Sequence, residues 1–185
     1  MVKYRYFETL EQLCALAENA VRLACGSVPR GRTDISALRK SCDQLICELE
    51  NALFSDFLPP LERDSIAACA HGLSRVTDAS EELLNHRPNG WLRNEEGEVC
   101  VALAEELTRS IALLRHLRKP EKSPDLQGFR ALLSKGRQLH QAQLWGLRTG
   151  ATPRSAAEAV LATGRLRGEL SRCFDRVVEI MLNNI

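Results

Sequence analysis

The chain of 185 residues contains few aromatic side chains and few residues that break helices. Aromatics make up 5% of it, and it has 11 glycines and 7 prolines. Leu, Ala, Glu and Arg dominate instead, and these residues are strong helix formers. Hydrophobic residues (44%) and charged residues (26%) stand at globular values, well away from a disordered composition. The composition therefore favours an all-α globular protein.

Long apolar runs are also missing. No stretch reaches the roughly 18 uncharged apolar residues that a membrane span needs, and the first residues lack the apolar region of a signal peptide. We therefore expect a cytoplasmic protein with no membrane span.

The seven cysteines form no C-x-x-C pair, and their number is odd. This agrees with a reducing compartment, where a buried thiol behaves as a small hydrophobic residue. We interpret the cysteines as residues of the core, with a metal or redox role as the alternative. They are Cys14, Cys25, Cys42, Cys47, Cys69, Cys100 and Cys173.

Catalytic motifs are absent as well. The sequence contains no phosphate-binding loop, dinucleotide fingerprint, zinc-protease motif or nucleophile elbow. The E-x-x-H repeats of ferritin-like di-iron bundles are missing too, and the four histidines are scattered. We expect a protein that is not an enzyme and carries no cofactor, with a bound divalent or iron ion as the less favoured alternative.

The net charge of +1 conceals two halves of opposite sign. Residues 1–108 hold 11 basic and 18 acidic residues, a net −7, whereas residues 109–172 hold 13 basic and 4 acidic residues, a net +9. The basic stretch 109–172 could present a face to phosphate, nucleic acid or lipid head groups. We favour the alternative that an acidic half packs beside a basic half, or that these are ordinary solvated helix faces. No compact run of basic residues stands out, and few aromatics interleave with them. No nucleic-acid partner is expected.

Prolines and glycines gather at five places and divide the chain into six segments. The breaks lie at residues 28–31, 58–60, 87–90, 119–124 and 149–153. Between them the apolar residues recur at helical spacing, as Leu38, Cys42, Leu45 and Leu49 do, and period-two alternation is absent. Six helices joined by short loops predict an antiparallel, six-helix up-and-down bundle. We expect residues 1–185 to form a single domain.

A short internal repeat suggests how the six helices arose. Leu73–Asp78 and Leu170–Asp175 both read L-S-R-x-x-D and lie 97 residues apart. They occupy equivalent ends of the third and sixth predicted helices. The repeat predicts two pseudo-repeated three-helix halves, at about 1–90 and 91–185.

One segment resembles a known family. Leu53–Ile66, which reads LFSDFLPPLERDSI, resembles the turn between the second and third helices of PhoU-like proteins. Arg172–Val178 is similar to that family's last helix. The likeness is to the short, single-domain regulators often encoded beside Pit-type phosphate transporters. It implies a PhoU-like bundle over nearly the whole chain.

The turn also makes sense from its own residues. Pro59 and Pro60 end the preceding helix, because a residue before proline is pushed out of the helical region. Asp64 is expected to accept free N–H groups at the start of the next helix. Phe57 and Ile66 are expected to clamp the corner. We interpret Pro59, Arg63 and Asp64 as structural residues.

The resemblance also implies a metal question. PhoU-like proteins carry metal clusters held by E/D-x-x-x-D motifs, whose two acids share one helix face. The family's paired positions fall here on Arg39 with Asp43, Ser74 with Asp78, Leu133 with Arg137, and Ser171 with Asp175. The first acid is missing from all four pairs.

Two interpretations of the remaining acids stay open. Asp43, Asp78 and Asp175 could converge on one divalent or iron ion, with His140 as a nitrogen ligand. We favour the other interpretation, in which they pair with arginines such as Arg39, Arg137 or Arg172, because a buried carboxylate needs a partner.

The resemblance implies a non-enzymatic regulator of inorganic phosphate transport. Such a protein would act by protein–protein contact at the cytoplasmic side of a membrane phosphate transporter of the Pit type, or on a related cytoplasmic regulator. A peripheral position at the inner face of the membrane would fit this role. The alternative is a self-associating helical scaffold or adaptor, a homodimer for example, that has lost the family's metal clusters. A metal-binding or storage bundle is a third, less favoured class.

Overall fold

The chain folds into six long α-helices. The computed structural model describes residues 5–26, 34–57, 59–87, 95–117 and 123–184, and this part of the chain contains no strand. The helices are α1 (Tyr6–Ala24), α2 (Asp34–Ser55), α3 (Arg63–His86), α4 (Glu95–Leu113), α5 (Leu126–Thr149) and α6 (Ala157–Asn183). Two short 3-10 helices, Leu114–His116 and Arg154–Ala156, follow α4 and precede α6. The prediction of an all-α fold with six helices is confirmed.

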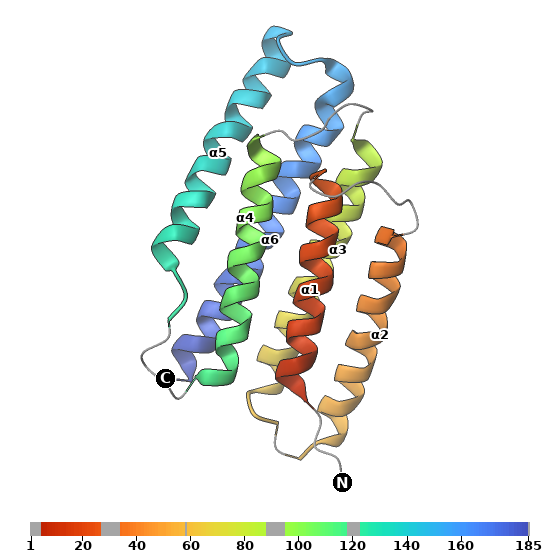
Figure 1. The fold of residues 1–185 in the computed structure, drawn as a ribbon, viewed down its shortest axis with the longest axis vertical. Coiled ribbons are helices and arrows are strands. Elements are labelled where there is room, and N and C mark those ends of the chain that lie inside the picture. The colour runs from red at the N-terminus through yellow and green to blue at the C-terminus, as the bar shows by residue number, and fades with distance from the viewer. Residues whose placement is uncertain (1–4, 27–33, 58, 88–94, 118–122, 185) are drawn as a thin grey trace.

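Successive helices alternate in direction (Figure 1). α1, α3 and α5 run one way, and α2, α4 and α6 run the other, as predicted for an up-and-down bundle. α1, α3, α4 and α6 pack on one another and form the centre. α2 covers α1 and α3 on one side, while α5 covers α4 and α6 on the other. The molecule is therefore a four-helix core with one outer helix on each flank.

The core follows from the helical spacing of apolar residues. In α1 the buried positions include Leu10, Leu13, Cys14, Ala17 and Val21, which recur every three or four residues. Each fully buried leucine of this kind contributes about 1.5–3 kcal/mol to folding. Burial on three sides, by α2, α3 and α4, makes α1 a central helix.

The cysteines are free thiols, and six of the seven are buried. Burial raises the pKa of Cys14 to about 12, so this thiol stays neutral and behaves as an apolar side chain. The interpretation of the cysteines as core residues therefore holds for six of them. It is wrong for Cys47, which is exposed on α2.

α5 is attached to the bundle by few side chains. Its buried residues are Phe129, Leu133, Gly136 and Gly146. Phe129 lies flat on Phe174 of α6, with 3.5 Å between the ring centroids. α5 ends at Gly150, whose φ of +80° is the left-handed conformation that favours glycine. The chain then turns into α6.

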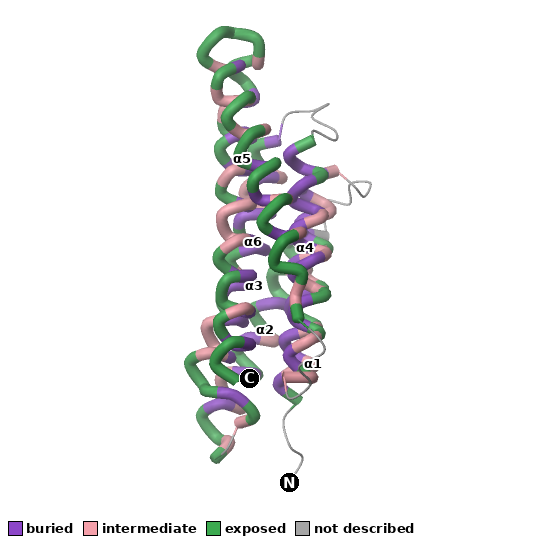
Figure 2. The backbone as a smooth tube through the Cα atoms, turned by 90° about the vertical axis from the view of Figure 1, so that its left-hand side faces the viewer, coloured by how far each residue is buried: buried purple, intermediate pink, exposed green. Residues whose placement is uncertain are grey.

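The α5–α6 hairpin projects beyond the other helices at one end of the bundle. Figures 1 and 2 both show this, and the projecting turn is coloured as exposed in Figure 2. Its side chains include Trp145 and Leu161, which are 63% and 51% exposed. Large apolar side chains are thus left open to solvent at this end.

We predict that Phe129→Ala destabilises the protein by about 3–5 kcal/mol, because it removes a buried aromatic ring and leaves a cavity against Phe174. Trp145→Ala, on the same helix, is the matched control and should change the free energy of unfolding by less than about 0.5 kcal/mol. Urea denaturation followed by circular dichroism measures both. Equal losses for the two variants would contradict the described packing of α5.

Candidate functional site

Asp78 lies in an ion-pair cluster between α2 and α3. Its Oδ1 is 3.2 Å from Nε of Arg39, which also binds Glu81 at 2.7 Å. Partial burial raises the pKa of Asp78, and the charge of Arg39 opposes this rise. The hydrogen bond to Glu81 and the charge of Asp78 raise the pKa of Arg39, and Asp43, which is exposed on α2, adds a smaller contribution. The favoured interpretation, in which the three aspartates pair with arginines such as Arg39, therefore holds for Asp78.

Asp175 lies apart from this cluster, exposed on α6. No group of three or more His, Cys, Asp or Glu side chains that could hold a metal ion occurs among the described residues, which include Asp43, Asp78 and Asp175. His140 contacts Glu96 rather than any of these aspartates. The structure therefore does not bring the three aspartates together as the ligands of one ion.

The two L-S-R-x-x-D motifs meet where α3 packs on α6. Arg75 and Arg172 hold the same place in the two motifs, and both bind Glu169, with N–O distances of 3.3 and 2.5 Å. Arg165 of α6 binds Glu82 of α3 at 2.6 Å. These side chains line a depression of about 270 Å³ and neutralise one another within it. The geometry assigns them a role in joining the two helices.

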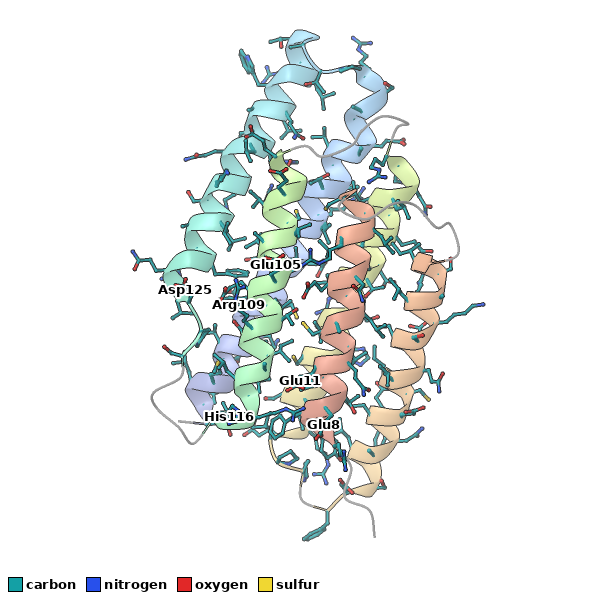
Figure 3. All side chains as sticks on the ribbon, in the orientation of Figure 1. Glu8, Glu11, Glu105, Arg109, His116 and Asp125 are labelled. Atoms are coloured by element: carbon teal, nitrogen blue, oxygen red, sulfur yellow. The ribbon has the colours of Figure 1, made fainter. Side chains whose placement is uncertain are left out.

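Much of the basic stretch 109–172 is neutralised inside the molecule. Arg115 binds Glu11 and lies 3.8 Å from Glu8, and Figure 3 shows both acids on α1 near the end of α4. Arg165 of α6 likewise binds Glu82 of α3 at 2.6 Å. An acidic half packs beside a basic half at these contacts, as favoured from the sequence.

The α2–α3 corner is held by Arg63. Its guanidinium donates hydrogen bonds to the carbonyl oxygens of Leu53 at 2.9 Å, Asp56 at 2.5 Å and Phe57 at 3.3 Å. The last carbonyls of a helix have no partner within it and carry partial negative charge, so a cation is stabilising there. Arg63, which is the first residue of α3, therefore caps the C-terminal end of α2.

Other expectations for this corner are only partly met. α2 ends at Ser55, before Pro59, and Ile66 is fully buried. The expectation that Phe57 clamps the corner is wrong, because its side chain is 88% exposed. Tyr6 ties the corner down instead, since its hydroxyl donates to Asp56 at 2.7 Å. Asp64 is exposed in the first turn of α3, where its charge suits the helix dipole.

A buried polar cluster joins α4, α5 and α6. Glu96 of α4 is 0% exposed. Its carboxylate accepts a hydrogen bond from Arg167 of α6 and lies 3.2 Å from Nδ1 of His140 on α5. Arg167 also donates to the carbonyl oxygen of Gly136 at 2.9 Å. A buried carboxylate is costly without such partners, so this cluster fixes the three helices relative to one another.

Two glycines make room for the cluster. A Cβ at Gly136 would lie 2.8 Å from Cδ of Arg167, and one at Gly164 would lie 2.6 Å from Cε1 of His140. This site was not predicted from the sequence, because Glu96 has the pattern of an ordinary acid in the first turn of a helix. The glycines inside otherwise helical segments were the signal that could have indicated it.

The surroundings shift the acid–base behaviour of the cluster. Burial raises the pKa of Glu96 to about 7, although the charge and hydrogen bond of Arg167 act in the opposite direction. Burial, together with the charge of Arg167, lowers the pKa of His140. Near neutral pH, His140 is therefore mainly uncharged, and the carboxyl of Glu96 is partly protonated.

Comparison with known proteins identifies the architecture. No family model matches the chain, and no curated protein matches it. The crystal structure of a PhoU-like protein from Shewanella oneidensis MR-1 matches with a TM-score of 0.66 and 16% identity, over 97% of each chain. The chain has a PhoU-like fold.

A second solved structure from the same organism agrees. It is a PhoU-like protein with a proposed role as a phosphate regulatory protein. It matches with a TM-score of 0.65 and 13% identity. The match covers 97% of this chain and 96% of that one. The prediction of a PhoU-like bundle over nearly the whole chain is thus confirmed. Asp43, Asp78 and Asp175 are therefore residues of a PhoU-like bundle, in which Asp78 binds Arg39.

We predict that Glu96→Gln gains stability relative to the parent protein as the pH rises. Because the folded pKa of Glu96, about 7, lies above its ordinary value of 4.5, the contribution of this group is full below pH 4.5. That contribution is lost as the pH rises through about 7, and the loss amounts to about 3 kcal/mol. Glutamine does not ionise, so the stability of the variant does not fall in this way as the pH rises.

The measurement is urea denaturation of both proteins between pH 4 and pH 8. Comparing the two cancels the titration of groups that they share. A difference that stays level, or that falls with pH, would show that the attraction of Arg167 outweighs burial at Glu96.

Proposed function

We propose that the protein is a non-enzymatic regulator of inorganic phosphate transport that acts by contact with a partner protein. The observation that carries this proposal is the PhoU-like fold, which matches PhoU-like structures over 97% of the chain. A Pit-type transporter, approached from its cytoplasmic side, is the partner that the resemblance of Leu53–Ile66 favours.

The described surface is suited to contact. Several large apolar side chains are exposed near the ends of helices and do not surround an enclosed site. They include Phe54 on α2, Phe57 at the α2–α3 corner and Trp145 on α5. Exposed aromatics of this kind are typical anchors of protein interfaces. None of the described helices has the length and apolar character to cross a membrane. The proposed action is therefore contact from outside the bilayer.

The test is phosphate uptake in a strain from which the gene has been deleted. We expect deletion to change the rate of radiolabelled phosphate uptake, or its dependence on external phosphate, and the intact chain to restore it. Uptake of sulfate, an anion of similar shape, is the control and should not respond.

Unchanged phosphate uptake over a range of external phosphate would contradict the proposal. If the purified protein then proved to be a stable homodimer in sedimentation experiments, the alternative of a self-associating scaffold would replace it. Exposed Phe54 and Phe57 would be the first residues to examine for that interface.

A further inference from the structure

α5 carries basic residues that no acid in the described part of the chain neutralises. Between Leu126 and Thr149 the sequence has four Lys or Arg residues and no Asp or Glu. These four, Arg130, Lys135, Arg137 and Arg148, are all exposed, and none forms an ion pair with a residue that the structure describes. By contrast, Arg115, Arg165, Arg167 and Arg172 each bind an acid. The unbalanced positive charge is thus concentrated on one outer helix.

Three of the four cations lie in a straight line. Arg137 and Arg148 follow Arg130 by seven and eighteen residues, which are about two and five turns of an α-helix. They therefore share one flank of α5 over about 27 Å, and we call them the α5 stripe. Lys135 points about 140° away from Arg130 around the helix axis and lies outside this stripe.

A groove opens at the end of the α5 stripe, between α5 and the start of α6. It has a volume of about 440 Å³ and is lined mainly by Leu144, Trp145, Leu147 and Leu161, with Arg148 at its edge. The guanidinium carbon of Arg148 lies 5.6 Å from the centroid of the Trp145 ring. An apolar hollow therefore continues the line of cations. It lies where α5 and α6 form the hairpin, whose projection from the bundle Figure 2 shows.

We propose that the α5 stripe and this groove form a docking surface for an acidic amphipathic helix of a partner protein. Acidic side chains spaced by whole helical turns on the partner would meet Arg130, Arg137 and Arg148. An apolar side chain of the same helix would enter the groove against Trp145 and Leu161. This is recognition of a helix by charge complementarity along its length and by an apolar anchor at one end.

The concave shape of the groove favours a protein partner over an anionic bilayer. A bilayer surface is fluid and broad, and it binds amphipathic proteins through apolar side chains that protrude into it. Here Leu144, Leu147 and Leu161 line a hollow, which a single side chain of a rigid partner fills better. Three cations in line over five turns also match the regular spacing of side chains on another helix.

The experiment places a photo-crosslinker in the groove. Trp145 is replaced by benzoylphenylalanine in the full-length protein, cells are irradiated, and the crosslinked peptide is sequenced by mass spectrometry. We expect one predominant adduct, on a segment of another protein that is acidic and has helical apolar spacing. The same crosslinker at Leu182, which is 69% exposed at the far end of α6, is the positional control and should not give this adduct.

A matched pair of charge reversals tests the stripe itself. Arg137→Glu should lower the crosslinking yield at position 145 about fivefold, because an attraction becomes a repulsion. Lys135→Glu makes the same change of charge two residues away but off the stripe, and it should leave the yield within about twofold. Circular dichroism of both variants establishes that they remain folded.

Several outcomes would overturn the inference. They are an adduct to lipid, an adduct to a second copy of this chain, adducts spread over unrelated proteins, or equal effects of the two charge reversals. The inference rests on the proposed function only in taking the partner to be a protein. If deletion alters phosphate uptake but Arg137→Glu does not, the docking surface fails and the proposed function stands. If an acidic helix is captured but deletion leaves uptake unchanged, the proposed function fails and the docking surface stands.

Discussion

The close packing of α3 against α6 is the contact on which the rest of the bundle depends. A Cβ at Gly72 would lie 3.1 Å from Sγ of Cys173, so the two helices pack closely here and a larger residue would require Cys173 to shift. Beside this contact Leu73 and Leu170 are fully buried, and the arginines of both L-S-R-x-x-D motifs bind Glu169. α1 and α4 complete the core around this pair, which leaves α2 and α5 as outer helices.

The two outer helices differ in how their charge is used. On α2, Arg39 is bound by Asp78 and Glu81 of α3, so its charge helps to hold α2 against α3. α5 is tied to the bundle by Phe129 and by the Glu96 cluster, whose partner on α5 is His140. Its arginines are exposed, and none of them forms an ion pair with a residue that the structure describes. One outer helix of this PhoU-like fold is therefore basic and exposed, in keeping with the proposed action by contact.

The sequence predicted the helices well because their signals are local. Apolar residues recur every three or four positions, and prolines mark the breaks, so number, order and direction could be inferred. That an aspartate such as Asp78 would pair with an arginine could also be inferred, because a buried carboxylate needs a partner. The exposure of Phe57 was not, since it depends on how the chain leaves α2. The burial of Glu96 depends on Arg167, 71 residues further along, and on the room left by Gly136 and Gly164.

Hydrogen exchange measured by mass spectrometry tests the layered arrangement most directly. If four helices form the core and α5 is an outer helix, amides of α3 and α6 near Gly72 and Cys173 should exchange most slowly. The half of α5 after His140 should exchange much faster, because few buried contacts hold it. Protection of that half equal to that of α3 would contradict the account, since α5 would then be a core helix with no flank to offer.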